Sequence, residues 1–200
     1  MTVSLAPKDQ ATSDGLRPIL VSLADRKPRT VELGASYSTS EGVGMAAKWA
    51  RYNIFGRADT VAALARASNI DSRLGGELTL PHWRRPQQTF KAGAGGYLNR
   101  TDAYDETGFG VRADIQRRFR KTSYITLGGS LDYSQTEEHN NLHVNSPDRN
   151  LFTAAGLAAG ALDRSDDPLD PKRGWRLEVR AEPTYLFGDD SLPYLKVQSQ

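Results

Sequence analysis

The chain has 200 residues, of which 38% are hydrophobic and 25% charged, and its formal net charge is +2. Basic and acidic residues are interspersed, which argues against a nucleic-acid partner, and the lack of cysteine excludes disulfides and thiolate metal sites. No apolar run is long enough for a membrane-spanning helix, but a membrane β-barrel stays possible because its lipid-facing residues alternate with polar ones.

The amino-terminal segment, MTVSLAPKDQ, has no basic stretch followed by an apolar run. It therefore does not read as a secretory signal. If the protein is exported, we expect this sequence to be part of a longer or processed chain.

From residue 30 onward, apolar and polar residues alternate with a period of two, which predicts β-strands with one apolar face. The clearest segments are 31–38, 43–50, 73–80, 109–116, 125–134 and 175–182. Four less regular segments complete a meander of about ten strands, namely 59–68, 88–99, 150–162 and 193–200. Because segment 58–68 is rich in alanine, a helix and a strand both remain open there.

The strand at 175–182, WRLEVRAE, shows the alternation most clearly, since its second face is ionic rather than merely polar. A soluble antiparallel sheet also alternates. A strand between lipid and a hydrated lumen, however, needs an apolar outer row and tolerates Arg and Glu on its inner row. The pattern alone leaves a membrane barrel and a soluble ligand-binding barrel or sandwich as alternatives.

The turns alternate between two types along the chain. One type is tight and rich in Arg and Pro: NIFGRAD, PHWRRPQQ, RRFRKTS and DPLDPKRG. The other is more polar and sometimes longer: STSEG, SNIDSR, NRTDAYDETG, TEEHNNLHVNSPDRN and FGDDSLP. Because successive turns of a meander lie at opposite ends of the sheet, we expect short turns at one end and long loops at the other, as in outer-membrane barrels.

Aromatic residues near both kinds of turn predict two interfacial girdles. The residues near the tight turns are Trp49, Tyr52, Phe55, Trp83, Phe119, Tyr124 and Trp175. Those near the polar loops are Tyr37, Tyr97, Tyr104, Tyr133, Tyr185 and Phe187.

Three segments carry a resemblance to a known family. DRSDDPLDPKRGWR at 163–176 and the segment 30–57, which ends in NIFGR, resemble the bacterial surface antigen family, the outer-membrane assembly and translocation barrels of the BamA and TamA type. The TamA-like branch fits best. Segment 15–30 is similar to the closing strand of a periplasmic POTRA domain. The residues of the two motif turns are Asn53, Phe55, Gly56, Arg57, Asp163, Arg164, Asp167, Pro168, Leu169, Asp170, Pro171, Arg173 and Gly174.

The resemblance implies an all-β, antiparallel, up-and-down transmembrane barrel of about sixteen strands. We expect this chain to supply the first ten or so. Residues 1–29 would be the end of a POTRA domain and a linker, and residues 30–200 the amino-terminal part of the barrel in the bacterial outer membrane. Pro168 and Pro171 would pin a periplasmic turn in which Asp and Arg neutralise each other.

The function that the resemblance implies is not enzymatic. Such barrels insert or secrete β-barrel or autotransporter clients through a lateral seam, where a client strand adds to the edge of the first strand. The expected partners are outer-membrane lipid, unfolded clients and an inner-membrane-anchored periplasmic protein, with no cofactor. The alternative is a passive porin-like or structural barrel. The seam strand would carry Val31, Leu33, Gly34, Ser36 and Tyr37.

The small residues Gly34 and Ser36 have two readings, because they either weaken the seam or fit a crowded lumen. His139 and His143 have the spacing of zinc ligands on a helix but lie in an Asn-rich segment that favours a solvated loop. A calcium site in the acidic cluster around Asp166 lacks the spacing of known calcium loops. We find no catalytic constellation in the sequence.

Overall fold

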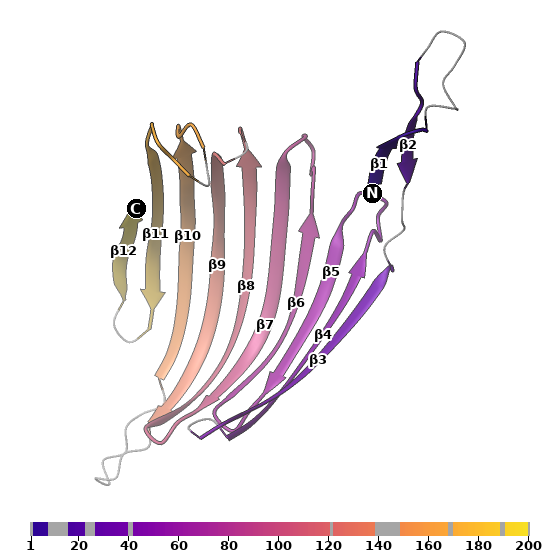
Figure 1. Cartoon of the computed structure of the whole chain (residues 1–200). Coiled ribbons are helices and arrows are strands. Elements are labelled where there is room, and N and C mark those ends of the chain that lie inside the picture. Colours follow the sequence, from indigo (N-terminus) through magenta and orange to yellow (C-terminus); the bar gives the residue numbers. More distant parts are fainter. Residues whose placement is uncertain are drawn as a thin grey trace.

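The computed structural model describes residues 2–7, 16–22, 27–39, 42–120, 122–138, 149–167, 170–188 and 191–199, and all its regular elements in these ranges are strands. Two strands form a small antiparallel sheet, β1 (Thr2–Leu5) and β2 (Ile19–Ser22). Ten more form one large sheet (Figure 1). They are β3 (Arg29–Ser38), β4 (Gly42–Tyr52), β5 (Thr60–Ala67), β6 (Asp71–Leu80), β7 (Gln88–Arg100), β8 (Tyr104–Arg118), β9 (Tyr124–Glu138), β10 (Arg149–Asp163), β11 (Arg176–Phe187) and β12 (Leu192–Ser199).

Each strand of the large sheet pairs antiparallel with its neighbours in sequence, so the sheet is an up-and-down meander with β3 and β12 at its edges. The prediction of an all-β fold with about ten barrel-type strands is confirmed. Segment 58–68, which left helix and strand open, forms β5. No helix among the described residues is long and apolar enough to cross a membrane.

The register sorts the side chains onto two faces. In an antiparallel pair, directly opposed residues point to the same side of the sheet: Leu177 opposes Leu162, and Glu178 opposes Ala161. What we call the apolar face carries the odd-numbered residues of β3, β4, β5, β8, β9, β11 and β12 and the even-numbered residues of β6, β7 and β10. The ionic face carries the alternate residues of each strand.

The apolar face is uncovered. Among the described residues the only buried hydrophobic side chains are alanines, at positions 6, 50, 62 and 161. Leu33, Leu74 and Phe109 on the apolar face are 79%, 68% and 54% exposed. A water-soluble sheet would bury such a row against a second layer, so this face requires an apolar environment outside the chain.

Charged residues on the apolar face are confined to the strand ends. They are Arg29, Arg51, Arg100, Asp105, Arg117 and Glu137, and each is within two residues of a strand terminus. The uncharged rows between them, such as 125–133 and 152–162, match the roughly 9–11 residues with which a β-strand crosses the hydrocarbon of a bilayer. The distribution of charge therefore fits a membrane-spanning sheet.

The two kinds of turn lie at opposite ends of the sheet, as predicted, but the expected difference in length is wrong. The connections 53–59, 81–87, 119–123 and 164–175, which define the basic end, contain seven, seven, five and twelve residues. Those at the opposite end, 39–41, 68–70, 101–103, 139–148 and 188–191, contain three, three, three, ten and four. The strands continue into the polar segments. At the basic end, residues with positive φ such as Asn53 and His82 follow closely after β4 and β6.

The aromatic residues do not all belong to girdles on the apolar face. Tyr52, Tyr97, Tyr104 and Tyr124 have the parity of the ionic face, so the prediction is wrong for them. The apolar face keeps aromatic clusters at both ends: Trp83 packs against Phe90 with ring centroids 5.2 Å apart, and Phe152 against Phe187 at 5.7 Å.

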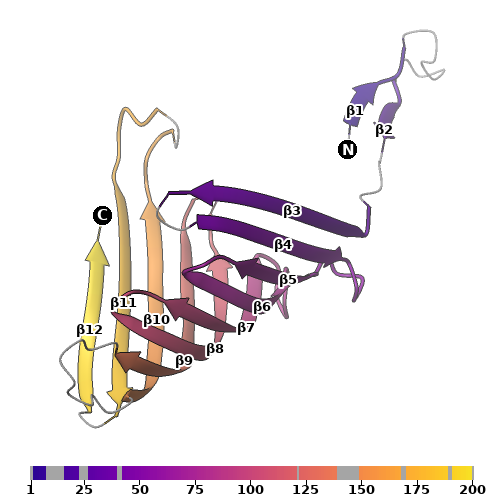
Figure 2. The ribbon, with the colours of Figure 1, turned by 90° about the horizontal axis from the view of Figure 1, so that it is seen from below.

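The sheet is strongly curled, as Figure 2 shows from below. Gly75, Gly95 and Gly110 are neighbours across β6, β7 and β8 on the ionic face. A Cβ atom on Gly95 would lie 2.9 Å from the carbonyl oxygen of Leu74 and 3.1 Å from the Cα of Gly75. Glycine is therefore required where the backbones approach this closely.

The β1–β2 hairpin precedes the basic end of β3 (Figure 1). The side chain of Arg17 donates hydrogen bonds to the carbonyl oxygen of Ala6, and the backbone N–H of Ala6 donates to the carbonyl of Pro18 at 2.9 Å. These bonds extend the pairing of the two strands at the end where the chain connects them. Segment 15–30, predicted to contain a strand, contributes β2.

Candidate functional site

The predicted seam strand is β3, an edge strand of the large sheet. Val31, Leu33 and Tyr37 lie on its apolar face, where all three are exposed. Gly34 and Ser36 lie on the ionic face opposite Ala46 and Gly44. An added Cβ on Gly34 would meet no atom within 4 Å. The surroundings of Gly34 are therefore open rather than crowded.

One hydrogen bond at the start of β3 shows which of its backbone groups bond to β4 and which face the open edge. The N–H of Tyr52 donates to the carbonyl of Pro28 at 2.9 Å, so this pair is of the hydrogen-bonded type. Hydrogen-bonded and non-hydrogen-bonded pairs alternate along an antiparallel ladder. The even-numbered N–H and C=O groups of β3 therefore face β4, and those of Val31, Leu33, Ala35 and Tyr37 face the open edge.

The first motif turn is built around Asp59, whose side chain is fully buried. Its carboxylate accepts backbone N–H groups from Ile54 and Phe55, each at 2.9 Å, and from Arg57 at 3.4 Å. Asn53 closes the turn from the other side, because its side-chain oxygen accepts the N–H of Ala58 at 3.0 Å. Burial raises the pKa of Asp59, but the three N–H donors outweigh it and hold the pKa below its ordinary value of 3.8.

The second motif turn has the same chemistry at Asp166. One carboxylate oxygen accepts the backbone N–H groups of Asp167, Lys172 and Arg173, each at 3.0 Å. The N–H of Arg173 contributes most to lowering the pKa of this carboxyl group below its ordinary value. At Asp166, backbone donors rather than an Arg side chain therefore stabilise the charged carboxylate. Pro168 and Leu169 lie outside the described residues.

The remaining motif residues surround these two carboxylates. Gly56 and Gly174 have φ of 73° and 108°, a region that favours glycine. At the base of the second turn Asp163 accepts the N–H of Ser165 at 2.9 Å and donates its own N–H to the hydroxyl of Ser123 at 3.0 Å. The other positions, Arg57, Arg164, Asp170, Pro171 and Arg173, lie on the exposed surface of the turns.

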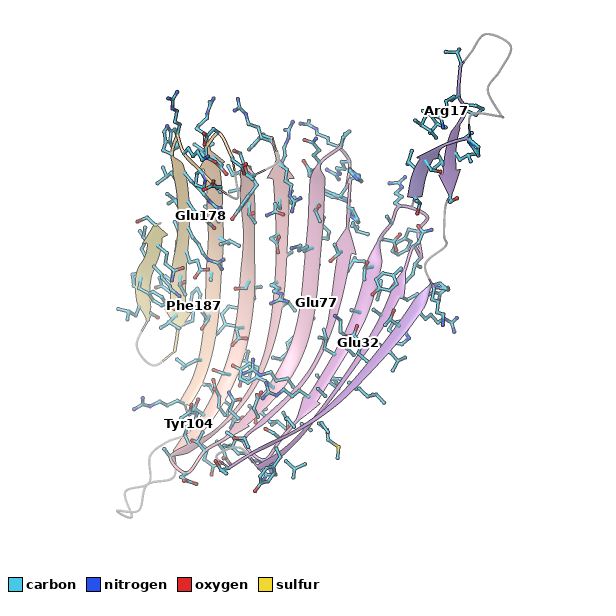
Figure 3. All side chains as sticks on the ribbon, in the orientation of Figure 1. Arg17, Glu32, Glu77, Tyr104, Glu178 and Phe187 are labelled. Atoms are coloured by element: carbon cyan, nitrogen blue, oxygen red, sulfur yellow. The ribbon has the colours of Figure 1, made fainter. Side chains whose placement is uncertain are left out.

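The ionic face carries charged side chains along the whole width of the sheet. Glu32, Glu77 and Glu178, labelled in Figure 3, come from β3, β6 and β11. Glu77 forms an ion pair with Arg112, 35 residues away in sequence. The hydroxyl of Tyr124 donates to Glu178 at 2.9 Å. Exposed ion pairs contribute only about 0–1 kcal/mol each, so this face depends on water for its stability.

A groove of about 780 Å³ lies over β3 to β9 on this face. Its charged lining comes from Glu32, Lys48, Arg66, Arg73, Glu77, Arg112 and Asp132. Between them lie the glycines of the curl, Gly75, Gly95 and Gly110. The groove is therefore wide and carries charges of both signs among apolar and glycine positions, and these charges need water or polar partners.

Tyr97 connects three strands inside this groove. Its hydroxyl donates to Glu106 at 3.3 Å and to Asp132 at 3.2 Å, and its ring covers Gly108, which is buried. An added Cβ on Gly108 would overlap the ring. The sequence analysis missed this arrangement because the glycine and the tyrosine become partners only through the β7–β8 register.

Within the described part of the chain, no group of three or more His, Asp or Glu side chains could hold a metal ion. His139 and His143 lie outside the described residues. The carboxylates of Asp59, which is buried, and Asp166, which is exposed, already accept backbone N–H groups.

Comparisons with known proteins agree with this geometry. The Omp85 superfamily domain matches residues 53–200. The crystal structure of BamA from Haemophilus ducreyi lacking POTRA domains 1–3 superposes with a TM-score of 0.69 and 12% sequence identity. The match covers 99% of this chain and 41% of that one, so the chain spans less than half the length of the matched structure. No curated protein sequence matches the chain.

The two matches agree with the uncovered apolar face in indicating a bacterial outer-membrane β-barrel protein. The match to the BamA structure supports the fold, and the domain match covers most of the chain, including both motif turns. The chain therefore belongs to the Omp85 superfamily.

Proposed function

We propose that the complete protein assembles or translocates outer-membrane β-barrel or autotransporter clients, and that β3 is the seam strand to which a client adds. The observation that carries the proposal is the direction of the backbone groups along β3. Its N–H and C=O groups at Val31, Leu33, Ala35 and Tyr37 face the open edge, which is the arrangement that strand addition uses.

Two further features support this role. The uncharged row of β3 spans only 31–37, whereas that of β10 spans 152–162, so fewer lipid-facing residues hold β3 in the bilayer. Glu32 and Gly34 on the other face of β3 line the hydrated groove. A client segment entering at this edge would therefore have a polar surface on one side and lipid on the other.

We also propose the domain division that the sequence suggests. The β1–β2 hairpin in 1–29 would end a periplasmic POTRA domain, and 30–200 would be the amino-terminal part of the barrel. In this arrangement the basic end faces the periplasm, because the hairpin precedes β3 at that end. The motif turns favour the TamA-like branch, whose partner would be an inner-membrane-anchored periplasmic protein.

The test uses the complete protein in phospholipid vesicles and a urea-unfolded β-barrel client, whose insertion is followed by heat-modifiability on gels. Leu33→Pro removes a donor from the open edge and leaves the bonds to β4 in place, since proline is tolerated on edge strands. Losing one hydrogen bond of about 1 kcal/mol predicts an insertion rate about fivefold lower. Leu33→Ala, which keeps the donor, should insert clients at nearly the wild-type rate.

Equal insertion rates for wild type, Leu33→Pro and Leu33→Ala would contradict strand addition at β3. Insertion no faster than in protein-free vesicles, together with steady ion conductance, would favour the passive porin-like alternative. A folded barrel in each variant, checked by its own heat-modifiability, makes the comparison valid.

A further inference from the structure

Two arginines of neighbouring strands face each other at the basic end of the apolar face. Arg29 of β3 and Arg51 of β4 are directly opposed in the register, and both are exposed. The next pair, Pro28 with Tyr52, is hydrogen-bonded, so the arginines form a non-hydrogen-bonded pair. In such pairs the Cα atoms are only about 4.5 Å apart and the side chains lie close together.

Like charges directly opposed across two strands are destabilising unless a counter-charge joins them. In the part of the chain that the structure describes, no ion pair or side-chain hydrogen bond joins Arg29 or Arg51 to another residue. None of the described residues therefore supplies a counter-charge to the arginine pair, although a counter-charge there would stabilise the sheet.

Other pairs of like charges that oppose each other in the sheet have a counter-charge from the chain itself. Arg66 and Arg73 are also directly opposed, on the ionic face, and Asp71 lies 3.7 Å from the first and 2.7 Å from the second. At the opposite end of the apolar face, the acidic pair Asp105 and Glu137 has Arg100 as a register partner of Asp105. The pair of Arg29 and Arg51 at the basic end has no such oppositely charged partner among the described residues.

The pair lies at the depth of lipid head groups. On the same face, the uncharged rows 31–37 and 43–49 begin directly beside it, and the neighbouring position of β4 is Trp49. Tryptophan favours the boundary between hydrocarbon and head groups. The adjoining turn exposes Ile54 and Phe55. Two guanidinium groups at this level face the phosphates of lipid head groups, and arginine binds phosphate through paired N–H donors.

We propose that Arg29 and Arg51 form a binding site for the phosphodiester of an anionic glycerophospholipid in the leaflet at the basic end. The lipid supplies the counter-charge that the described residues lack, and it fixes the start of the edge strand at the membrane surface. This inference rests on the contact of the apolar face with lipid and on the proposed orientation of the basic end toward the periplasm, and it does not depend on the insertion of clients at β3.

The test is native mass spectrometry of the complete protein titrated with phosphatidylglycerol in a phosphatidylcholine background. The double variant Arg29→Gln/Arg51→Gln is compared with Arg66→Gln/Arg73→Gln, a matched pair on the ionic face. A basic residue at an anionic membrane surface contributes about 1 kcal/mol, so we expect the affinity for phosphatidylglycerol to fall about fivefold for each arginine lost from the first pair. The second pair should leave it unchanged.

Two further variants keep the result interpretable. Arg29→Lys/Arg51→Lys retains the charge and should retain most of the affinity. If the double glutamine variant does not fold, the single variants Arg29→Gln and Arg51→Gln should each lose about fivefold. Soluble glycerol phosphate at the same concentration should not compete, because it lacks the acyl chains that hold a lipid beside the apolar face.

The proposal is overturned if both double variants bind phosphatidylglycerol as the wild type does, or if both lose affinity equally, since the second result indicates a general effect of net charge. Competition by glycerol phosphate would also overturn it, because the ligand would then be a free anion. If lipid A displaces phosphatidylglycerol, and this displacement depends on the two arginines, the site binds the lipid of the opposite leaflet. That result would overturn the assignment of the leaflet.

Discussion

Asp59 and Asp166 organise the two motif turns through the same chemistry, a carboxylate that accepts several backbone N–H groups. The donors come from different positions in the two cases: they precede Asp59, and they follow Asp166. No common spacing therefore marks the two aspartates in the sequence. What the turns share is a backbone that would otherwise leave its N–H groups without partners.

The pKa of Asp59 gives its turn a defined dependence on pH. Because the folded-state pKa lies below the ordinary value of 3.8, the charged carboxylate stabilises the fold above about pH 4, and this contribution is lost as the pH falls through the folded-state pKa. Asp59→Asn should lower the urea midpoint of the reconstituted protein at neutral pH. The difference from wild type should shrink in acid, and a difference independent of pH would contradict the role of the charge.

Two glycines on the ionic face provide a matched pair of substitutions. Gly108→Ala places a methyl group inside the ring of Tyr97 and forces the ring off Glu106 and Asp132, which should cost about 1–3 kcal/mol of unfolding free energy. Gly34→Ala meets no atom within 4 Å and should change stability by less than about 0.5 kcal/mol. Equal urea midpoints for the two variants would contradict the packing of Tyr97 on Gly108.

At the scale of the strand, one face meets lipid and the other meets water. Neighbouring residues of β5 illustrate this: Ala65 lies on the apolar face between Ala47 and Leu74, and Leu64 lies on the ionic face between Lys48 and Gly75. A strand of this kind tolerates charge at alternate positions only. The identity of the face, rather than the hydrophobicity of the residue replaced, should decide the effect of a substitution.

Adding the same charge at these two positions tests the assignment. Ala65→Glu places a carboxylate in the hydrocarbon and should cost at least about 1 kcal/mol, since lipid-facing Arg or Lys costs about 2–4 kcal/mol and Glu somewhat less. Leu64→Glu places it opposite Lys48 in the hydrated groove and should be nearly neutral. Urea unfolding in lipid vesicles measures both, and a larger loss for Leu64→Glu would reverse the two faces.

The two faces of a strand could be predicted from the sequence where apolar and polar residues alternate regularly. β6, β9 and β11 have the faces that the sequence predicts because their large apolar residues recur mainly at alternate positions. β5 was ambiguous because alanine fits a helix, a lipid-facing row and a packed strand equally well. Connection lengths were predicted wrongly because polar residues at a strand end, such as Asp105 and Glu106, still pair in the ladder.

Side-chain partners across strands could not be predicted, since they depend on register. Tyr97 was assigned to a lipid-facing girdle by its position near a loop, whereas its partner Gly108 places it on the ionic face. The opposed pair Arg29 and Arg51 escaped notice for the same reason. Both need the pairing of two strands at single-residue accuracy, and a shift of one residue exchanges the faces.

At the scale of the whole molecule, the sheet is stable only between two environments. Its exposed apolar rows would aggregate in water, and its ionic face would be costly in hydrocarbon. The curl of the sheet places the ionic face inside the groove. A membrane on one side and a hydrated interior on the other satisfy both faces, which is the arrangement of an outer-membrane barrel.

The measurement that tests this account most directly is the accessibility of spin labels at Leu177 and Arg176 in the complete protein reconstituted in lipid vesicles. Leu177 lies on the apolar face opposite Leu162, and Arg176 lies on the ionic face beside Glu178, which accepts its hydrogen bond at 3.0 Å. A label at Leu177 should relax faster with oxygen dissolved in the bilayer, and one at Arg176 faster with a water-soluble nickel chelate. Equal responses at the two positions would contradict the division of the sheet into a lipid-facing and a water-facing side.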